Sequence, residues 1–315
     1  MHMANHLVSP EVGSAMFLVS SAGIGYAIRK IKSNPKQLER SDIGLFAASS
    51  ALVFTAQMVN YSLPLTGASG HIVGGVLLAL LFGRAPSTLA MSVILTLQSL
   101  IFADGGLFAL GANIFNMAII PCLIVVPLMQ KLIGQSRALL PIIATIVSLQ
   151  LGAFLVVVET QASQITTLPF GDFLLRMQPI HLAISLIEAV VTVGLLALIQ
   201  KIKGKRQAVY MLSGLAFAVG AFVSLLASQI PDGLEWASEK TSSGISLTSQ
   251  DNLLQAAEKF QTSLAFLPDY SFATIHANEM LGTMLSGILG CALTLFAIAC
   301  LSLLLVQKPT LLSKT

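Results

Sequence analysis

Apolar stretches of helix length recur along almost the whole sequence, and they constrain its fold more than any other feature. A run of about 20 apolar residues crosses the hydrocarbon core of a bilayer as an α-helix, because backbone polar groups must be satisfied internally there. Charged residues make up only 10% of the chain, whereas soluble domains carry about 25%. We therefore expect an all-α, polytopic transmembrane bundle of about nine helices. The predicted spans cover roughly residues 11–29, 43–62, 70–83, 86–102, 106–130, 138–158, 178–200, 208–228 and 279–306.

Basic residues are distributed unevenly between the segments that connect these spans. Most of the 17 Lys and Arg residues fall in alternate connections, notably 29–40 and 201–206. By the positive-inside rule these connections are cytoplasmic. The rule predicts an outside N-terminus and a cytoplasmic C-terminus, in a multi-pass protein of the cell inner (plasma) membrane. The basic segment 29–40 is also suited to contact anionic lipid.

The character of the chain changes near residue 205. One apolar helix follows the basic connection, then a polar segment over 229–278, and then a last apolar helix. The polar segment opens with Pro231-Asp232-Gly233, which is typical of a turn. We predict a membrane domain over 1–205 and a second module over 206–315, made of two helices joined by the external loop 229–278.

The pair Met1-His2 is a candidate metal site. The Met1 amine, the His2 amide nitrogen and the His2 imidazole are adjacent donors that close a five-membered and a six-membered chelate ring in one plane. A second imidazole can fill the open fourth corner. Four planar nitrogens suit Ni(II), Cu(II) or low-spin Co(II), and not Mg or Ca. The alternative interpretation is a frayed terminus without function.

Several polar residues are expected near this pair. His71 follows a Gly/Ser-rich turn, and the predicted topology brings it to the same membrane face as His2. Polar groups inside spans are costly and usually face a bundle interior or a cavity. For Asn113 and Asn116, the alternative is that they form hydrogen bonds between helices without contacting a metal. The candidates for a supporting layer around the ligands are His6, Ser69, Gln98, Asn113 and Asn116.

Other ligand-type residues are assigned structural roles. His181 and Glu188 lie seven residues apart, and so on one face of the seventh predicted span. We favour a packing role for this pair over a place on a metal path. All three cysteines lie in apolar runs without CxxC spacing, which argues against a disulfide framework or a thiolate metal site.

Together these motifs resemble the CbiM/NikM family, the metal-binding membrane components of energy-coupling factor importers for cobalt and nickel. The resemblance covers about residues 1–200, and its motifs fall in family order. The sequence Pro231 to Glu235 resembles the small N component, so the chain resembles a fusion of the two. The matching motifs are Met1-His2, Thr66-Gly-Ala-Ser-Gly-His71-Ile-Val-Gly-Gly, Asp104-Gly-Gly and Leu110-Gly-Ala-Asn113-Ile-Phe-Asn116.

The resemblance implies that Ni2+ or Co2+ is the transported substrate, and the sequence does not distinguish the two. The implied ligands are the Met1 amine, the His2 amide and imidazole, and the His71 imidazole. Partners implied by the family are a transmembrane T component and cytoplasmic ATPase subunits on separate chains. The family start usually continues differently after Met-His, whereas here His6 lies four residues from His2. The open roles for His6 are a fifth donor, a ligand that binds the metal first, or a neighbour of the ligands. We expect it instead to face solvent and not to be required for binding.

Two other classes of function are considered. The sequence lacks a GxxxxGK motif, so the chain is not expected to hydrolyse ATP itself. The alternative is a rhomboid-like intramembrane serine protease using Gly67-Ala68-Ser69-Gly70. Such an enzyme needs a general base beside Ser69, but His181 lacks the expected flanking glycines and His276 lies in the external loop. A membrane sensor or scaffold is the third class, and no nucleic-acid partner is expected.

Overall fold

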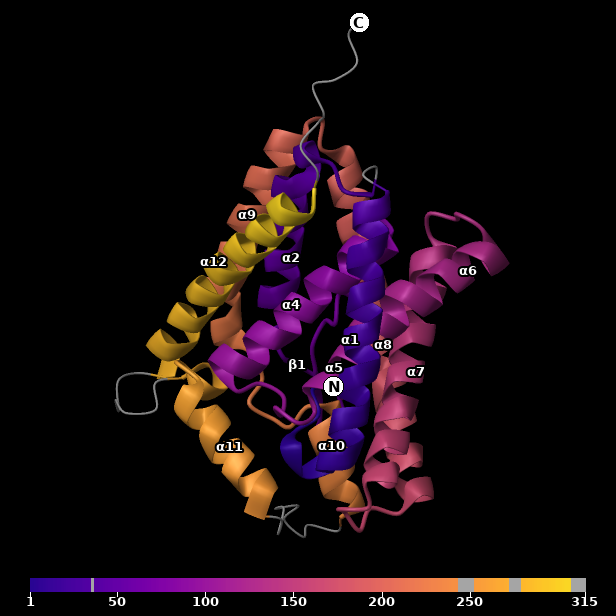
Figure 1. Ribbon diagram of the computed structural model, residues 1–315, viewed down its shortest axis with the longest axis vertical. Coiled ribbons are helices and arrows are strands. Elements are labelled where there is room, and N and C mark those ends of the chain that lie inside the picture. Colours follow the sequence, from indigo (N-terminus) through magenta and orange to yellow (C-terminus); the bar gives the residue numbers. More distant parts are fainter. Residues whose placement is uncertain (35–36, 243–251, 272–278, 307–315) are drawn as a thin grey trace, which may run out of the picture.

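A computed structural model describes residues 1–34, 37–242, 252–271 and 279–306 (Figure 1). His276 and the C-terminal residues 307–315 lie outside the described residues. The described part is a helical bundle, so the all-α prediction is confirmed. Its α-helices are α1 (Pro10–Ser33), α2 (Ile43–Gln57), α3 (Gly75–Phe82), α4 (Arg84–Phe102), α5 (Leu110–Ile114), α6 (Val126–Ile133), α7 (Leu139–Ser163), α8 (Phe170–Lys201), α9 (Lys205–Ala221), α10 (Gly233–Thr241), α11 (Asn252–Leu264) and α12 (Glu279–Leu305). The remaining elements are the π-helix η4 (Phe115–Val125), the 3-10 helices η1 (Asn5–Leu7), η3 (Arg40–Asp42), η5 (Val223–Leu226) and η6 (Pro268–Tyr270), and the antiparallel strands β1 (Tyr61–Ser62) and β2 (Ser69–Gly70).

Seven helices in the described part are long and apolar enough to cross a membrane, fewer than the nine spans predicted. The other two predicted spans do contain helices, but α2 has 15 residues and α3 only 8. Gly74 and Gly83 bound α3, and both have φ of +78°. This left-handed backbone, which favours glycine, interrupts the helix on each side. The seven spanning helices are Pro10–Ser33, Arg84–Phe102, Leu110–Ile133, Leu139–Ser163, Phe170–Lys201, Lys205–Leu226 and Met280–Leu305.

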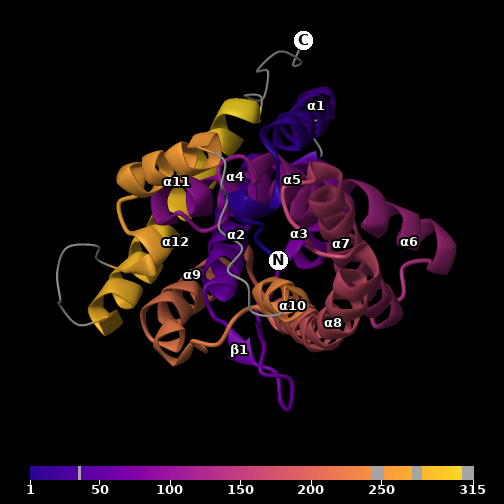
Figure 2. The ribbon, with the colours of Figure 1, turned by 90° about the horizontal axis from the view of Figure 1, so that it is seen from below.

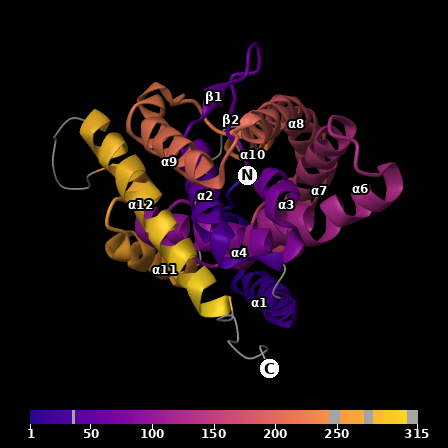
Figure 3. The ribbon, with the colours of Figure 1, turned by 90° about the horizontal axis from the view of Figure 1, so that it is seen from above.

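The helices of the C-terminal segment pack directly on the rest of the bundle. α2 packs against both α9 and α12, and α9 also packs against α12 (Figure 3). Gly220 of α9 and Gly287 of α12 face each other so closely that a methyl group on either would meet the backbone of the other. Such small-residue contacts are how helices approach one another in a membrane, where lipid gives no hydrophobic driving force between them.

The N-terminal segment folds into the centre of the bundle. Figures 1 and 2 show the N-terminus surrounded by helices and lying beside α10 in the view from below. Met1 is 6% exposed and Met3 is fully buried. The chain leaves this position through Ser9, whose side chain accepts a hydrogen bond from the amide of Val12 and caps α1. The N-terminal segment is therefore fixed at its start by the burial of Met1 and at its end by the Ser9 cap.

Candidate metal centre

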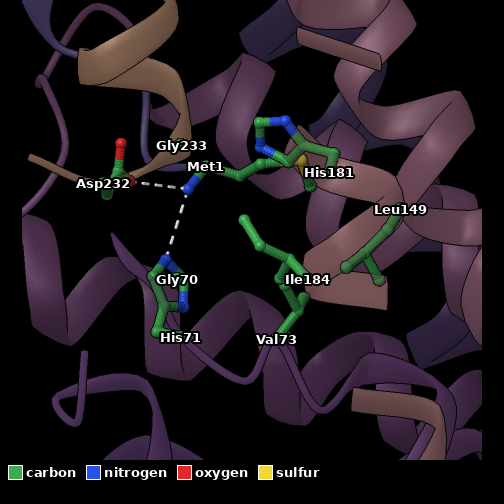
Figure 4. A pocket seen from close by; sticks show the side chains of 9 residues that line it. All are labelled: Met1, Gly70, His71, Val73, Leu149, His181, Ile184, Asp232 and Gly233. Atoms are coloured by element: carbon green, nitrogen blue, oxygen red, sulfur yellow. Dashed lines mark hydrogen bonds and ion pairs between the residues drawn. The ribbon is translucent and has the colours of Figure 1, made fainter. Parts of the chain in front are cut away.

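The nitrogen of Met1 lies between one imidazole and one carboxylate. It is 3.2 Å from Nε2 of His71 and 3.0 Å from Oδ2 of Asp232 (Figure 4). His71 follows strand β2, and Asp232 precedes α10. Elements far apart in the sequence thus bring a nitrogen ligand and a counter-charge to the same terminal amine.

The imidazole of His2 stacks beside that of His71. Their ring centroids are 5.2 Å apart and the planes are inclined by 28°. Nε2 of His2 lies 3.2 Å from Oε1 of Gln98, and its Nδ1 lies 3.6 Å from Oδ1 of Asp104. The predicted ligands Met1, His2 and His71 are therefore close together, and Gln98 contacts one of them.

Asn113 fixes the backbone that follows His2. The amide of Met3 donates to Oδ1 of Asn113 at 2.8 Å, and Nδ2 of Asn113 donates to the carbonyl of Met3 at 3.2 Å. Gly105 leaves room for this contact. A Cβ at Gly105 would lie 2.8 Å from Nδ2 of Asn113 and 3.6 Å from Cβ of His2, and its φ is +82°. Asn113 thus serves as a clamp on the N-terminal loop.

Gln261 of α11 is a second clamp, which we did not predict from the sequence. Its Oε1 accepts hydrogen bonds from Nδ2 of Asn5 and from the amide of Leu107. Its Nε2 donates to the carbonyls of Ser99 and Gly105 at 3.0 and 2.7 Å. The local sequence of an amphipathic helix carries no signal that one glutamine is buried against a distant loop.

Asp232 was also missed as a site residue, although its turn was predicted. Its Oδ1 accepts from the amides of Leu234 and Glu235 and caps α10, which leaves Oδ2 for Met1. Burial alone would raise the pKa of Asp232, but the charge of the terminal amine and the hydrogen bond from the amide of Glu235 hold it below its ordinary value. Burial and the nearby amine lower the pKa of His71. An unprotonated His71 is the form that binds metals.

Ser69 joins the centre to the C-terminal segment and is not a nucleophile. Its amide donates to the carbonyl of Pro231 at 2.7 Å, and its hydroxyl donates to the carbonyl of Ile230 at 2.8 Å. A hydroxyl that donates to a carbonyl is not activated by a base, which the protease alternative requires. Ser69 instead positions the loop that carries His71.

Two other predicted neighbours lie away from the amine. His6 is on η1 and is half-buried, so the prediction that it faces solvent was wrong. Burial lowers its pKa, and the charge of Glu258 opposes this shift. Asn116 donates to Oε2 of Glu159 at 2.8 Å and lines a second small cavity, which Met1 also lines. Neither is within hydrogen-bonding contact of Met1 or His2 among the contacts described here.

The His181 and Glu188 pair does not form an ion pair. The carboxylate of Glu188 accepts from the amides of Val73 and Gly74, both at 2.8 Å, and so fixes the loop after His71. His181 donates from Nδ1 to the carbonyl of Met177 at 2.8 Å and lines a cavity with Met1, His71 and Asp232 (Figure 4). The two side chains therefore have separate hydrogen-bond partners.

Side chains alone do not make a metal cage in the described residues. No group of three or more His, Cys, Asp or Glu side chains there is arranged to hold an ion. A site at this position must draw on the terminal amine or the main chain in addition to the imidazoles. The two stacked histidines beside a buried amine suit such a mixed set.

Comparison with known proteins identifies a transport family. The family described as "Cobalt uptake substrate-specific transmembrane region", CbiM, matches residues 2–206, and the PDGLE domain family matches residues 206–308. A putative fused nickel transport protein NikMN of Archaeoglobus fulgidus is 32% identical over 203 residues, which is 63% of this chain and 65% of the relative. A putative metal transport protein of Haloquadratum walsbyi is 33% identical over 62% of this chain and 87% of its own length.

Similarity in structure agrees with these matches. A crystal structure of a transition metal transporter is similar with a TM-score of 0.55 and 27% identity, over 64% of this chain and 93% of that chain. A probable fused nickel transport protein LarMN of Lactiplantibacillus plantarum is 35% identical, but the match spans only 36% of its length. The relatives are transport proteins and not enzymes. This chain is thus a multi-pass membrane protein of the CbiM family, with a PDGLE domain following its CbiM region.

Proposed function

We propose that this chain captures Ni2+ or Co2+ at the outer face of the membrane as the substrate-binding component of an energy-coupling factor importer. The proposed ligands are the Met1 amine, the His2 amide nitrogen, the His2 imidazole and the His71 imidazole. The distance of 3.2 Å between the Met1 nitrogen and Nε2 of His71 carries this proposal, because two donors that close can bind one ion. The names of the relatives, which include nickel and cobalt transport proteins, support the choice of metal.

The chemistry of the site follows from the protons that the metal displaces. A ligand must be deprotonated to bind, so the ammonium and the His2 amide both release a proton. Strongly coordinating late transition metals drive this step and hard cations do not. Asp232 then loses its ammonium partner and balances the charge of the cation instead. Selection for nickel or cobalt over magnesium and calcium is thereby built into the donor set.

Transport requires further chains in this proposal. The sequence has no phosphate-binding GxxxxGK motif, so a cytoplasmic ATPase and a transmembrane T component must supply the coupling. The binding face is outside, as the distribution of basic residues predicts, and the C-terminus is cytoplasmic. We also propose that residues 1–205 form the metal-binding domain and residues 206–315 the fused module that covers it.

Metal analysis of the purified full chain with an unmodified Met1 tests the proposal. We expect about one Ni2+ or Co2+ per chain in the parent. His2→Ala and His71→Ala should each lose tight binding, because three donors leave a labile site. His6→Ala is the matched control and should keep it. Equal damage from all three substitutions, or full metal content in His71→Ala, would refute this ligand set.

A further inference from the structure

His181 has one ring nitrogen without a partner in the described part of the structure. The side chain is 1% exposed, and its Nδ1 lies 2.8 Å from the carbonyl oxygen of Met177, one turn earlier in α8. A carbonyl only accepts hydrogen bonds, so Nδ1 carries the proton and Nε2 has a free lone pair. Nε2 is buried and has no hydrogen-bond partner.

This arrangement is the one that metal-binding histidines adopt. One ring nitrogen donates to a carbonyl and fixes the ring, and the other is left for the metal. A histidine that only packs would satisfy both nitrogens, since an unsatisfied buried polar atom costs about 1–3 kcal/mol. The free Nε2 is therefore available to a ligand that enters the cavity.

The cavity beside His181 is also lined by residues of the N-terminal centre. Met1, His71, Asp232 and His181 all line it, and Figure 4 shows the His181 ring beside Met1. A Cβ on Gly233 would lie 3.2 Å from Cε1 of His181, so the PDGLE segment packs closely against the ring. His181 is thus held at the wall of the cavity from two sides.

The other polar groups of this cavity already have partners in the described structure. The Met1 nitrogen lies within hydrogen-bonding distance of both Asp232 and His71. Nε2 of His181 has no such partner, so it is the nitrogen most accessible to a cation that enters the cavity.

We propose that His181 is a further metal ligand, which holds Ni2+ or Co2+ in this cavity before the cation enters the N-terminal plane. Because no three side chains there form a preformed cage, water and the Asp232 carboxylate complete the coordination at this stage. This inference rests on the proposed function, which it extends by one binding step.

The rate of metal loading tests the step in the full chain. His181→Asn keeps an amide donor for the Met177 carbonyl and removes the position of Nε2. We expect the yellow planar Ni2+ spectrum to reach its full final intensity, but about tenfold more slowly than in the parent. His6→Asn is the control and should load at the parent rate. Loading of His181→Asn within twofold of the parent, at equal melting temperature, would overturn the proposal.

A second measurement is independent of the planar site and of any substitution at His181. His2→Ala removes one donor of the plane and does not line the cavity beside His181, and Co2+ is then titrated into this variant with 15N-labelled histidine. The Nε2 signal of His181 should shift and broaden as the paramagnetic ion binds, while that of His6 should not. An unaffected His181 signal would refute the ligand role. Absence of planar binding in the parent would instead refute the proposed function alone.

Discussion

The carboxylate of Asp232 contacts the nitrogen of Met1 at 3.0 Å, although the two residues are 231 positions apart in the chain. The same carboxylate caps α10 through its other oxygen, so its position is fixed by the local fold of the PDGLE segment. The C-terminal segment therefore contributes a charge to the centre of the CbiM region. Its second contribution is Gln261, which binds the loop around Asn5.

Substitution of Asp232 by Asn should destabilise the metal-free chain. The amide oxygen of Asn still caps α10, but the buried ammonium of Met1 loses its counter-charge, at a cost of about 1–3 kcal/mol. The loss should persist in the metal-loaded chain, where the carboxylate balances the charge of the cation instead of that of the ammonium. Thermal unfolding with and without Ni2+ measures the destabilisation of the metal-loaded and the metal-free chain. Asp172→Asn, at an exposed position in the first turn of α8, is the control, and an equal effect of the two substitutions would contradict this role.

Extension of the N-terminus should abolish tight metal binding. A glycine before Met1 moves the amine away from the His2 amide and breaks the five-membered ring. The buried Met1 nitrogen also has no space for another residue between His71 and Asp232. Metal content after purification measures the effect, and the same glycine added at the C-terminal end is the control. Normal metal content in the N-terminally extended chain would exclude the amine as a ligand.

The apolar pattern predicted the helices well because bilayer length and composition suffice for that. It overestimated the lengths of α2 and α3, because hydropathy does not register the left-handed backbone at Gly74 or the strand at Tyr61. Met1, His2 and His71 were predicted together because the predicted topology brings them to the same membrane face and all three supply nitrogen ligands. Asp232 and Gln261 were not, because their partners lie far away in the sequence and only the tertiary fold brings them close.

Gly105→Ala should weaken the centre far more than Gly134→Ala. Both glycines have positive φ, so each substitution carries a backbone cost of about 1 kcal/mol. Only at Gly105 does the added methyl group also lie 2.8 Å from Nδ2 of Asn113, whereas nothing lies within 4 Å at Gly134. Loss of the Asn113 clamp should release Met3 and with it His2. Nickel affinity of the two variants compares them, and equal affinities would show that the clamp is dispensable.

Metal affinity should fall steeply as the pH drops from about 8 to 6, because the amine and the His2 amide must lose protons to bind. His71 should add nothing to this slope. Burial lowers its pKa well below 6.5, so it is already neutral throughout that range and releases no proton. Calorimetry in buffers of different ionisation enthalpy should count about two protons per Ni2+ near pH 7, from the amine and the amide. The residual binding of His71→Ala should keep the same pH slope at lower affinity.

The bound Ni2+ should be yellow and diamagnetic, as a planar field of four nitrogens requires. A pH-independent affinity, or a paramagnetic octahedral nickel spectrum in the parent, would exclude the proposed plane.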